Sequence, residues 1–453
     1  MPEYLAPGVY IEEVSYRSKS IEGVSTTTTG FIGPTRFGPT DIEPDIITSL
    51  GEFERTYGDR QQLVYSGSAM HNYMWHATRA FFEEGGKRVH ISRVFLATSG
   101  TDDGCAGADI GGTGATDPLI QVSARFPGSA GNMYVRFTVR LSQNILSGDD
   151  DGTGALKPKV NGLMDRDVVW IKKAGGSAVL YMAESYYDSD TKEDTWRFNP
   201  AAGAAVELNG GITASLTASS SDDIRIVTLA ITVEKLDRSV EVWGGIPIDP
   251  DHERDGSPDG MTSRFDEVPS NLSQSRTLPI VINVSNVDTG LDVLTALCVG
   301  NTDLLTQINN LDSSDEDRSV DIELSNGNDG QRPTASEYEG TDDPATTIKT
   351  GLKQFEDIED ISIVAAPGST FGLESSYRAS AMTIMGLLIS HASRMRYRIA
   401  VLDSGNDHVA FVVEIPQSTT AHQALTFKYH RRYNCMRHRS FMQNESKETQ
   451  IIW

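Results

Sequence analysis

The hydrophobic and polar positions near the start of the chain alternate in a way that is typical of an extended strand. In residues 9–14, successive side chains point to opposite sides, with the period that a β-strand requires. This strand has no hairpin partner beside it in the sequence. It therefore pairs with a distant strand of its own chain or offers its backbone groups to another subunit. The apolar and aromatic side chains available to it are Tyr4, Leu5, Val9, Tyr10, Ile11 and Val14.

Residues 26–95 predict a strand, then a helix, then a second strand. The β-branched run 26–29 leads into Gly30 and is followed by Gly-Pro turns, which is typical of a strand closed by a turn. Apolar residues three and four apart then form the stripe of a helix that begins near Ser66 or Ser68 and ends at Gly85. The stripe consists of Met70, Tyr73, Met74, Ala77 and Phe81, and residues 88–95 alternate as a strand.

The middle of the chain has a different composition. Residues 98–117 are rich in Gly, Asp and Thr and predict a crossing loop. Short segments separated by Gly and Asp clusters then predict a mostly β region that extends to about residue 335. The predicted strands are 119–125, 133–141, 168–172, 178–182, 195–198, 224–233 and 278–284.

From Thr341 onward the helical period returns. Pro344 fits the first turn of a helix whose apolar stripe is Ile348, Leu352 and Phe355. The next predicted elements are a buried strand at 361–366, a helix at 375–393 and a strand at 398–403. Helix, strand, helix and strand joined by short loops predict an α/β unit with a parallel pair of strands.

Several segments, taken in order, resemble the contractile tail sheath protein family, which includes phage tail sheaths and the sheaths of phage-tail-like injection systems. The matching segments are Pro7-Gly8-Val9-Tyr10, Gly30-Phe31-Ile32-Gly33, Gly38-Pro39, residues 47–58, residues 85–94, residues 126–132 and residues 341–403. Residues 324–330 resemble the stretch that closes an inserted domain in this family, although Asn326 stands where a glycine is usual. The resemblance covers residues 4–425, with the inserted domain matched only at its edges.

The resemblance implies an α+β fold, in which a discontinuous α/β sandwich core carries a large, mostly β inserted domain and an extended N-terminal arm. In this family the arms add strands to a neighbour's sheet, so residues 4–14 are expected to form the inter-subunit strand. The expected divisions are an arm and linker at 1–25, a first core segment at 26–99, a β-rich outer domain at 100–335, a second core segment at 336–427 and an atypical basic tail at 428–453.

The resemblance also implies a function, that of a structural subunit of a contractile tail sheath. Copies are expected to stack as rings around an inner tube protein, above baseplate proteins, and to contract so that the tube is driven through a target envelope. Such a subunit is not an enzyme and needs no cofactor, because each copy stores free energy in its packing on assembly. The expected location is a virion tail or injection-system particle assembled in the bacterial cytoplasm.

Other functions stay open at this point. A baseplate-proximal or capping sheath paralogue keeps the structural class and needs only one of two arms. A β-rich adhesin or an α/β hydrolase belongs to a different class. A signal peptide or a nucleophile motif would favour that class, and the sequence contains neither in recognisable form.

The last stretch of the chain departs from the family pattern. Family members continue with further core strands and a C-terminal arm, which are not recognisable here. Residues 428–453 instead hold six Lys and Arg residues against two Glu residues, a local charge of +4 in a chain whose formal charge is −24. A truncation or reading-frame change near residue 428 is the favoured explanation, and a basic tail that binds an acidic partner is the alternative.

The composition of the chain limits which classes of partner and which compartment are expected. The chain has 63 Asp and Glu residues against 39 Lys and Arg residues, so direct binding to nucleic acid is not expected. No apolar run is long enough for a transmembrane helix, so no membrane insertion is expected. Cys105, Cys298 and Cys435 are far apart, which suits assembly in a reducing compartment.

Candidate metal ligands follow no recognised spacing. The acidic runs 149–152 and 312–317 lack the downstream Glu of a calcium-binding loop and favour solvated loops. His71, His76 and His90 belong to a helix and a strand without a metal-ligand pattern. We therefore expect no metal-binding residues.

Catalytic chemistry is equally sparse in the sequence. The turn at Pro367-Gly368 lacks the glycines and the lysine of a phosphate-binding loop. Asp403 ends a strand, where α/β enzymes often have an acid, and His391 and His408 are near it in sequence, but no nucleophile turn accompanies them. We expect no catalytic or cofactor-binding residue.

Overall fold

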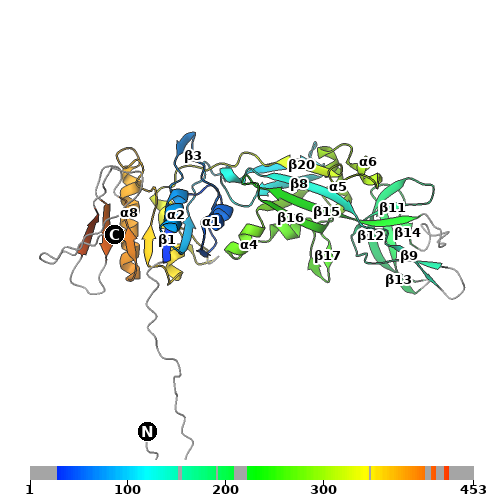
Figure 1. Ribbon diagram of the computed structural model, residues 1–453. Helices are drawn as coiled ribbons and strands as arrows, with labels where there is room; N and C mark the ends of the chain where they lie inside the picture. The colour runs from blue at the N-terminus through cyan, green and yellow to red at the C-terminus, as the bar shows by residue number, and fades with distance from the viewer. Residues whose placement is uncertain are drawn as a thin grey trace, which may run out of the picture.

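The structure is a computed structural model that describes residues 28–150, 156–189, 192–208, 222–345, 348–403, 410–414 and 423–427. It has an α+β fold: a seven-stranded sheet with its helices forms one end of an elongated molecule, and a strand-rich region forms the other (Figure 1). The predicted arm at 1–25 and basic tail at 428–453 lie outside the described residues.

The seven-stranded sheet is assembled from two stretches of the chain that are far apart in sequence. Its order is β2-β5-β1-β23-β24-β25-β26. The strand β1 pairs in parallel with β5 and with β23, and β24 continues the parallel part, whereas β2, β25 and β26 pair antiparallel. The bounds are β1 Thr28–Gly33, β2 Ile46–Ile47, β5 Arg88–Arg93, β23 Ile363–Ala365, β24 Ile399–Val401, β25 Ala410–Glu414 and β26 Gln423–Phe427.

Helices cover both faces of this sheet (Figure 1). The adjacent residues Phe31 and Ile32 of β1 point to opposite faces and belong to different cores. On the Phe31 face lie α1 (Leu50–Tyr57) and α2 (Tyr73–Glu83). On the Ile32 face lie α7 (Ala335–Glu339), the 3₁₀ helix η2 (Gly351–Asp357) and α8 (Arg378–Met395). The helix predicted at 375–393 is thus confirmed as α8.

The helix predicted from Thr341 is wrong. The chain instead forms a short hairpin, β21 (Asp342–Asp343) with β22 (Ile348–Lys349), before η2. Gly351 has a φ of +59°, which an α-helix cannot contain, and a Cβ there would lie 2.7 Å from the carbonyl oxygen of Glu337. The predicted α-helix therefore cannot continue through Gly351, where η2 begins, and Ile348 is exposed whereas Leu352 and Phe355 are buried.

The start of α2 also differs from the prediction. Met70 belongs to a hairpin, β3 (Leu63–Tyr65) with β4 (Ser68–Met70). Its loop, Ser66-Gly67, has positive φ angles at both residues, as tight hairpins require. The helix begins afterwards, with Asn72 as N-cap accepting a hydrogen bond from the Trp75 amide.

The region between β5 and β23 is built around an eight-stranded antiparallel sheet. Its central strand β15 pairs with β8 along one side. Along its other side it pairs first with β11, through residues 223–227, and then with β16, through residues 228–234. The strands are β8 Tyr134–Leu141, β11 Val168–Lys172, β12 Ala178–Asp188, β13 Glu193–Pro200, β14 Val206–Glu207, β15 Asp223–Glu234, β16 Val240–Pro247 and β20 Ser319–Glu323. The predicted strands at 133–141, 168–172 and 224–233 are confirmed here.

Smaller elements complete this region and include several that the sequence pattern did not predict. Residues 98–117 are not only a loop, because β6 pairs with β7 in a three-stranded sheet. Helices α3, α5 and α6 pack beside the strands and share their core, whereas Leu272 of α4 packs with Phe31, Phe53 and Tyr57 in a core of the seven-stranded sheet. The bounds are β6 Gly107–Gly111, β7 Leu119–Ala124, β9 Leu146–Asp150, β10 Leu156–Val160, β17 Glu253–Arg254, β18 Ser257–Pro258, β19 Ile280–Ser285, η1 Ser129–Gly131, α3 Met261–Asp266, α4 Leu272–Thr277, α5 Gly290–Gly300 and α6 Leu304–Asn309.

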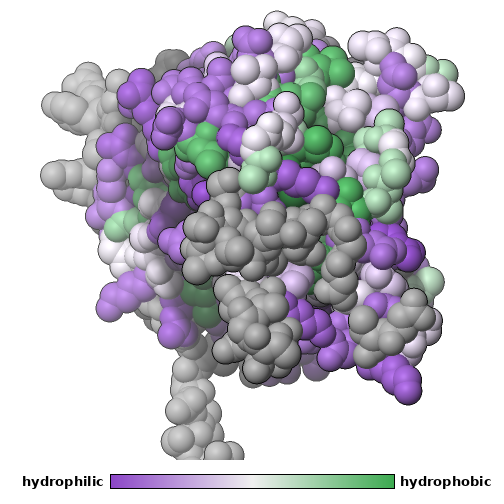
Figure 2. Space-filling view, turned by 90° about the vertical axis from the view of Figure 1, so that its right-hand side faces the viewer, coloured by the Kyte–Doolittle hydropathy of each residue, from purple (hydrophilic) through white to green (hydrophobic). Residues whose placement is uncertain are grey.

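The surface of the molecule at the end far from α8 carries polar and apolar side chains side by side (Figure 2). One of the exposed apolar side chains in this region is Val179 of β12. Among the residues that the structure describes, no helix combines the length and the hydropathy needed to cross a lipid bilayer.

Candidate functional site

The residues predicted to form the inter-subunit strand, Tyr4, Leu5, Val9, Tyr10, Ile11 and Val14, lie outside the described residues. The structure does describe the sheet edge formed by β26. In the described part of the chain, β26 pairs only with β25, so the backbone groups on its outer side have no strand partner there. An open sheet edge of this kind is where an additional strand can pair.

A joint between the sheet and the inserted region is built around the buried guanidinium of Arg93, at the end of β5. Arg93 is 1% exposed and donates to the carbonyl oxygens of Thr35 at 3.2 Å, Pro127 at 2.8 Å and Gly38. Burial lowers the pKa of Arg93 to about 10, and the nearby Asp329 carboxylate opposes that shift. The side chain therefore stays cationic at neutral pH and binds the loop after β1 to the loop after β7.

Asp329 ties three segments together at the same joint. Its carboxylate accepts hydrogen bonds from the amide of Val64 at 2.8 Å, the amide of Ser129 at 2.9 Å and the hydroxyl of Ser129 at 2.7 Å. Arg36 donates to the same Ser129 hydroxyl at 3.1 Å and forms an ion pair with Asp59. The hairpin β3–β4, η1 and the segment that returns from the inserted region are thus held by one buried carboxylate.

The backbone at the joint explains the unusual asparagine in residues 324–330. Asn326 has a φ of +68°, a left-handed conformation that glycine adopts freely and asparagine tolerates. Across the joint, Gly128 has a φ of +128°, and a Cβ on it would lie 1.9 Å from the carbonyl oxygen of Arg36. The side chain of Asn132 also receives a hydrogen bond from the Gly327 amide at 2.9 Å, so residues 126–132 and 324–330 contact each other.

A cavity of about 310 Å³ lies beside this joint. It is lined by Val64, Ser66, Thr98, Asn328 and Asp329, together with glycines and Ser129. The acid in this lining, Asp329, has its hydrogen bonds to Val64 and Ser129 already in place. The lining offers no cysteine or histidine, so we assign the cavity no chemical role.

The suggested pairing of Asp403 with a histidine does not form with His391. Asp403 follows the carboxyl end of β24 and accepts a hydrogen bond from the Thr370 hydroxyl at 2.6 Å. His391 lies on the buried face of α8, and its Nε2 is 2.7 Å from Nη1 of Arg398, which precedes the amino end of the same strand. The strand β24 therefore separates them, and His408 lies outside the described residues.

The histidines and acidic runs considered as metal ligands are dispersed. His71 and His76 are exposed, and His90 is buried with Nδ1 2.9 Å from the carbonyl oxygen of Pro44. The run 312–317 lies in an exposed loop, where Asp315 pairs with Arg140. No group of three or more His, Cys, Asp or Glu side chains is arranged to hold a metal ion within the part of the chain that was searched, namely the described residues. The side chains of 149–151 are not among those described.

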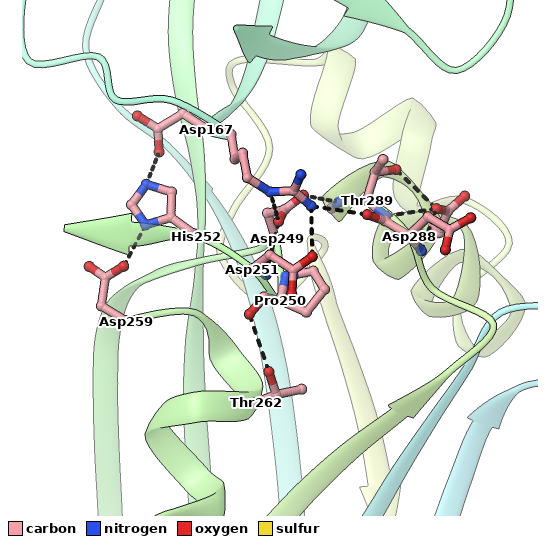
Figure 3. Close-up of polar contacts among 12 residues, drawn as sticks. Asp167, Asp249, Pro250, Asp251, His252, Asp259, Thr262, Asp288 and Thr289 are labelled. Carbon is pink, nitrogen blue, oxygen red and sulfur yellow. Dashed lines mark hydrogen bonds and ion pairs between the residues drawn. The ribbon is translucent and has the colours of Figure 1, made fainter. Parts of the chain in front are cut away.

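A buried polar network that sequence reasoning missed lies in the inserted region (Figure 3). His252 is 0% exposed and lies between Asp259, which contacts Nδ1, and Asp167, whose Oδ1 is 3.4 Å from Nε2. Beside it, Asp249 is also 0% exposed and accepts a hydrogen bond from Arg166 Nε at 2.7 Å. The dense run of charges in residues 249–255 was the available signal in the sequence.

Asp249 connects this network to the start of α5. Its Oδ2 accepts a hydrogen bond from the amide of Gly290 at 2.8 Å, so the carboxylate stands at the positive end of that helix. A Cβ on Gly290 would lie 2.6 Å from Val168 Cγ2, which explains the glycine there. Because His252 and Asp249 are closed to solvent, they cannot reach a substrate, and the arrangement serves to fasten residues 249–260 to β11 and α5.

Neither the protein-family models nor the curated proteins compared with this sequence match it.

Proposed function

We propose that this chain is a structural subunit of a contractile tail sheath, whose copies polymerise as stacked rings around an inner tube protein and contract to drive the tube through a target envelope. The observation that carries the proposal is the outer side of β26, which has no strand partner among the described residues, taken together with the strand pattern of residues 9–14. Strand addition between copies requires a donor strand and an acceptor edge, and the predicted strand at 9–14 and the outer edge of β26 fit these two roles.

The joint between the sheet and the inserted region also supports a mechanical role. Force applied to one end of a subunit reaches the other only if the connection resists bending. Buried Arg93 and Asp329 make hydrogen bonds to several loops at this connection, and such buried charged contacts are costly to break. In the proposed lattice, each subunit would pass force from its inserted region to the sheet that carries the strand contacts.

The partners in this proposal are other copies of the chain, the inner tube protein and baseplate proteins, in a virion tail or injection-system particle assembled in the bacterial cytoplasm. No reaction is needed when the assembly contracts, because the free energy is stored in the packing of the subunits. Direct contact with nucleic acid does not belong to the proposal, since a formal charge of −24 disfavours it.

Strand addition can be tested with two variants, one that lacks the donor strand and one whose acceptor edge is blocked. Deleting residues 1–20 removes the donor and should leave a folded monomer that does not polymerise. Successive amides of a strand point to opposite sides, so one of Leu425→Pro and Thr426→Pro removes an outward amide of β26, while the other disrupts the ladder with β25. We expect the outward variant to fold and to remain monomeric.

Mixing the two defective proteins gives the sharper result. An arm-deleted copy still accepts a strand and an edge-blocked copy still donates one, so the mixture should form dimers that do not grow, as measured by mass photometry and negative-stain electron microscopy. Long tubes from the arm-deleted protein alone would rule out the arm as the donor. A mixture without dimers would rule out β26 as the acceptor.

A further inference from the structure

The His252 network contains a contact that only a shared proton can make favourable. The carboxylate of Asp259 accepts from Nδ1 of His252 and also pairs with Arg254 at 3.2 Å, so it is an acceptor and Nδ1 carries the hydrogen. The opposite ring nitrogen, Nε2, has no hydrogen-bond partner among the described residues and faces Asp167 Oδ1 at 3.4 Å. Without a proton on one of these atoms, a lone pair faces a carboxylate oxygen in a site closed to water.

We propose that Asp167 and His252 form a proton-dependent latch, in which one proton held between His252 Nε2 and Asp167 Oδ1 keeps residues 252–259 fastened to β11, and loss of that proton releases them. The latch is a property of the inserted region and holds whichever assembly the chain forms.

The environment of Asp167 favours keeping the proton. Its other oxygen, Oδ2, accepts the amide of Met164 at 2.8 Å, so Oδ1 is the oxygen available to carry a hydrogen toward the ring. Burial disfavours the charged carboxylate and so raises the pKa of Asp167, which keeps the carboxyl group protonated to a higher pH. A protonated Asp167 that donates to Nε2 and an imidazolium that donates to the Asp167 carboxylate are two positions of the same single proton.

The charged groups around the pair are engaged in other contacts. Arg254 pairs with Asp259, and Arg166 pairs with Asp249 and Asp251 and donates to the backbone carbonyl of Asp288. Asp292 accepts hydrogen bonds from Thr289 at the start of α5, and Asp165 accepts from Ser185. The charged side chains of the surrounding elements are Asp165 and Arg166 before β11, Asp249, Asp251, Glu253, Arg254, Asp255 and Asp259 in 249–260, and Asp288 and Asp292 at α5.

The latch fastens a defined piece of chain. Residues 249–260 leave the end of β16, form the hairpin β17–β18 and lead directly into α3. Within the segment, the Asp259 amide donates to the His252 carbonyl at 3.1 Å, and the exchange of this amide reports whether the segment has opened. The hairpin projects from the inserted region in Figure 1, where a change in its position alters the outer surface of the molecule.

Amide hydrogen exchange of the full-length protein between pH 5 and pH 10 tests the latch. After correction for the intrinsic pH dependence of exchange, protection of residues 252–259 should fall about tenfold per pH unit above the pH at which the proton leaves. Asp167→Asn supplies a fixed N–H donor toward Nε2, so its protection should stay high and independent of pH. The matched control, Asp165→Asn, should keep the wild-type profile because Asp165 contacts Ser185 and not His252.

Two results would overturn the latch: wild-type protection that does not change over this pH range, or an Asp167→Asn variant that keeps the wild-type transition. If the Asp167→Asn protein does not fold, ¹⁵N-histidine spectra of the wild-type protein decide the question, with the His252 signal assigned by its loss in His252→Asn. We expect the His252 ring signal and the exchange of residues 252–259 to change over the same pH range. A ring signal that changes while exchange does not would contradict the latch.

Discussion

Arg398 donates a hydrogen bond from Nη1 to Nε2 of His391, at 2.7 Å, in the buried layer between α8 and the sheet. Because Nε2 accepts from a cation, His391 is neutral in the folded protein. Burial and the Arg398 charge together lower the pKa of His391 to about 3. Arg398 also donates to the carbonyl oxygens of Ile361 at 3.1 Å and Ile358, so it joins β23 and β24 to the end of η2.

This contact predicts that acid destabilises the sheet through His391. The folded-state pKa is below the ordinary value of 6.5, so the contribution of His391 to stability is complete above pH 6.5 and is lost as the pH falls toward 3. The loss is about 1.4 kcal/mol per pH unit in that range. His391→Gln keeps an acceptor for Arg398 without a titrating ring, so its urea-unfolding free energy should fall less between pH 7 and pH 5. Parallel curves for the two proteins would contradict the prediction, and His71→Gln, at an exposed position, is the control.

Arg93 is predicted to be essential to the joint. Arg93→Ala leaves the carbonyl oxygens of Thr35, Gly38 and Pro127 without this donor in a buried site, and we expect a loss of about 3 kcal/mol or more in the free energy of unfolding. Arg88 is on the same strand but exposed, so Arg88→Ala should change stability by less than about 0.5 kcal/mol. Chemical denaturation monitored by tryptophan fluorescence measures both, and equal losses would refute a special role for Arg93.

Alanine substitutions at two glycines with positive φ compare the cost of backbone strain alone with the cost of strain plus a steric clash. Gly67→Ala meets no atom within 4 Å, so it should cost only the strain of a left-handed residue, about 1 kcal/mol. Gly128→Ala brings a Cβ within 1.9 Å of the carbonyl oxygen of Arg36 and must displace the joint, so we expect a loss of at least about 3 kcal/mol. Thermal unfolding of the two variants provides the comparison. Similar melting temperatures would mean that the joint can relax around the added methyl group.

Asn326 is predicted to be replaceable by glycine but not by a β-branched residue. Its φ of +68° suits glycine, so Asn326→Gly should change the free energy of unfolding by no more than about 1 kcal/mol. Asn326→Val forces a branched side chain into the left-handed region and should cost about 2 kcal/mol. Denaturant titration of both proteins measures the difference, and a well-tolerated valine would show that this segment adopts another backbone conformation.

Elements with a strong local pattern were predictable from the sequence. The strand at 168–172 has the predicted bounds, and the helix predicted at 375–393 is observed as Arg378–Met395. The helix α5 was missed because it is buried around much of its circumference and therefore has no clear polar face. The strand β6, with the sequence Gly-Ala-Asp-Ile-Gly, has little strand propensity of its own and is stabilised by pairing with β7.

The alternation of side chains along each segment determined which residues could form strands and helices, because a repeat of two or of 3.6 residues is a property of the local chain. The choice of partners was decided by the tertiary structure. Thr29 pairs with Ile363 across the whole inserted region, and Asp167 meets His252 only where β11 passes the segment after β16. Burial, desolvation and the proton between Asp167 and His252 exist only when distant segments enclose the same volume, so no local pattern encodes them.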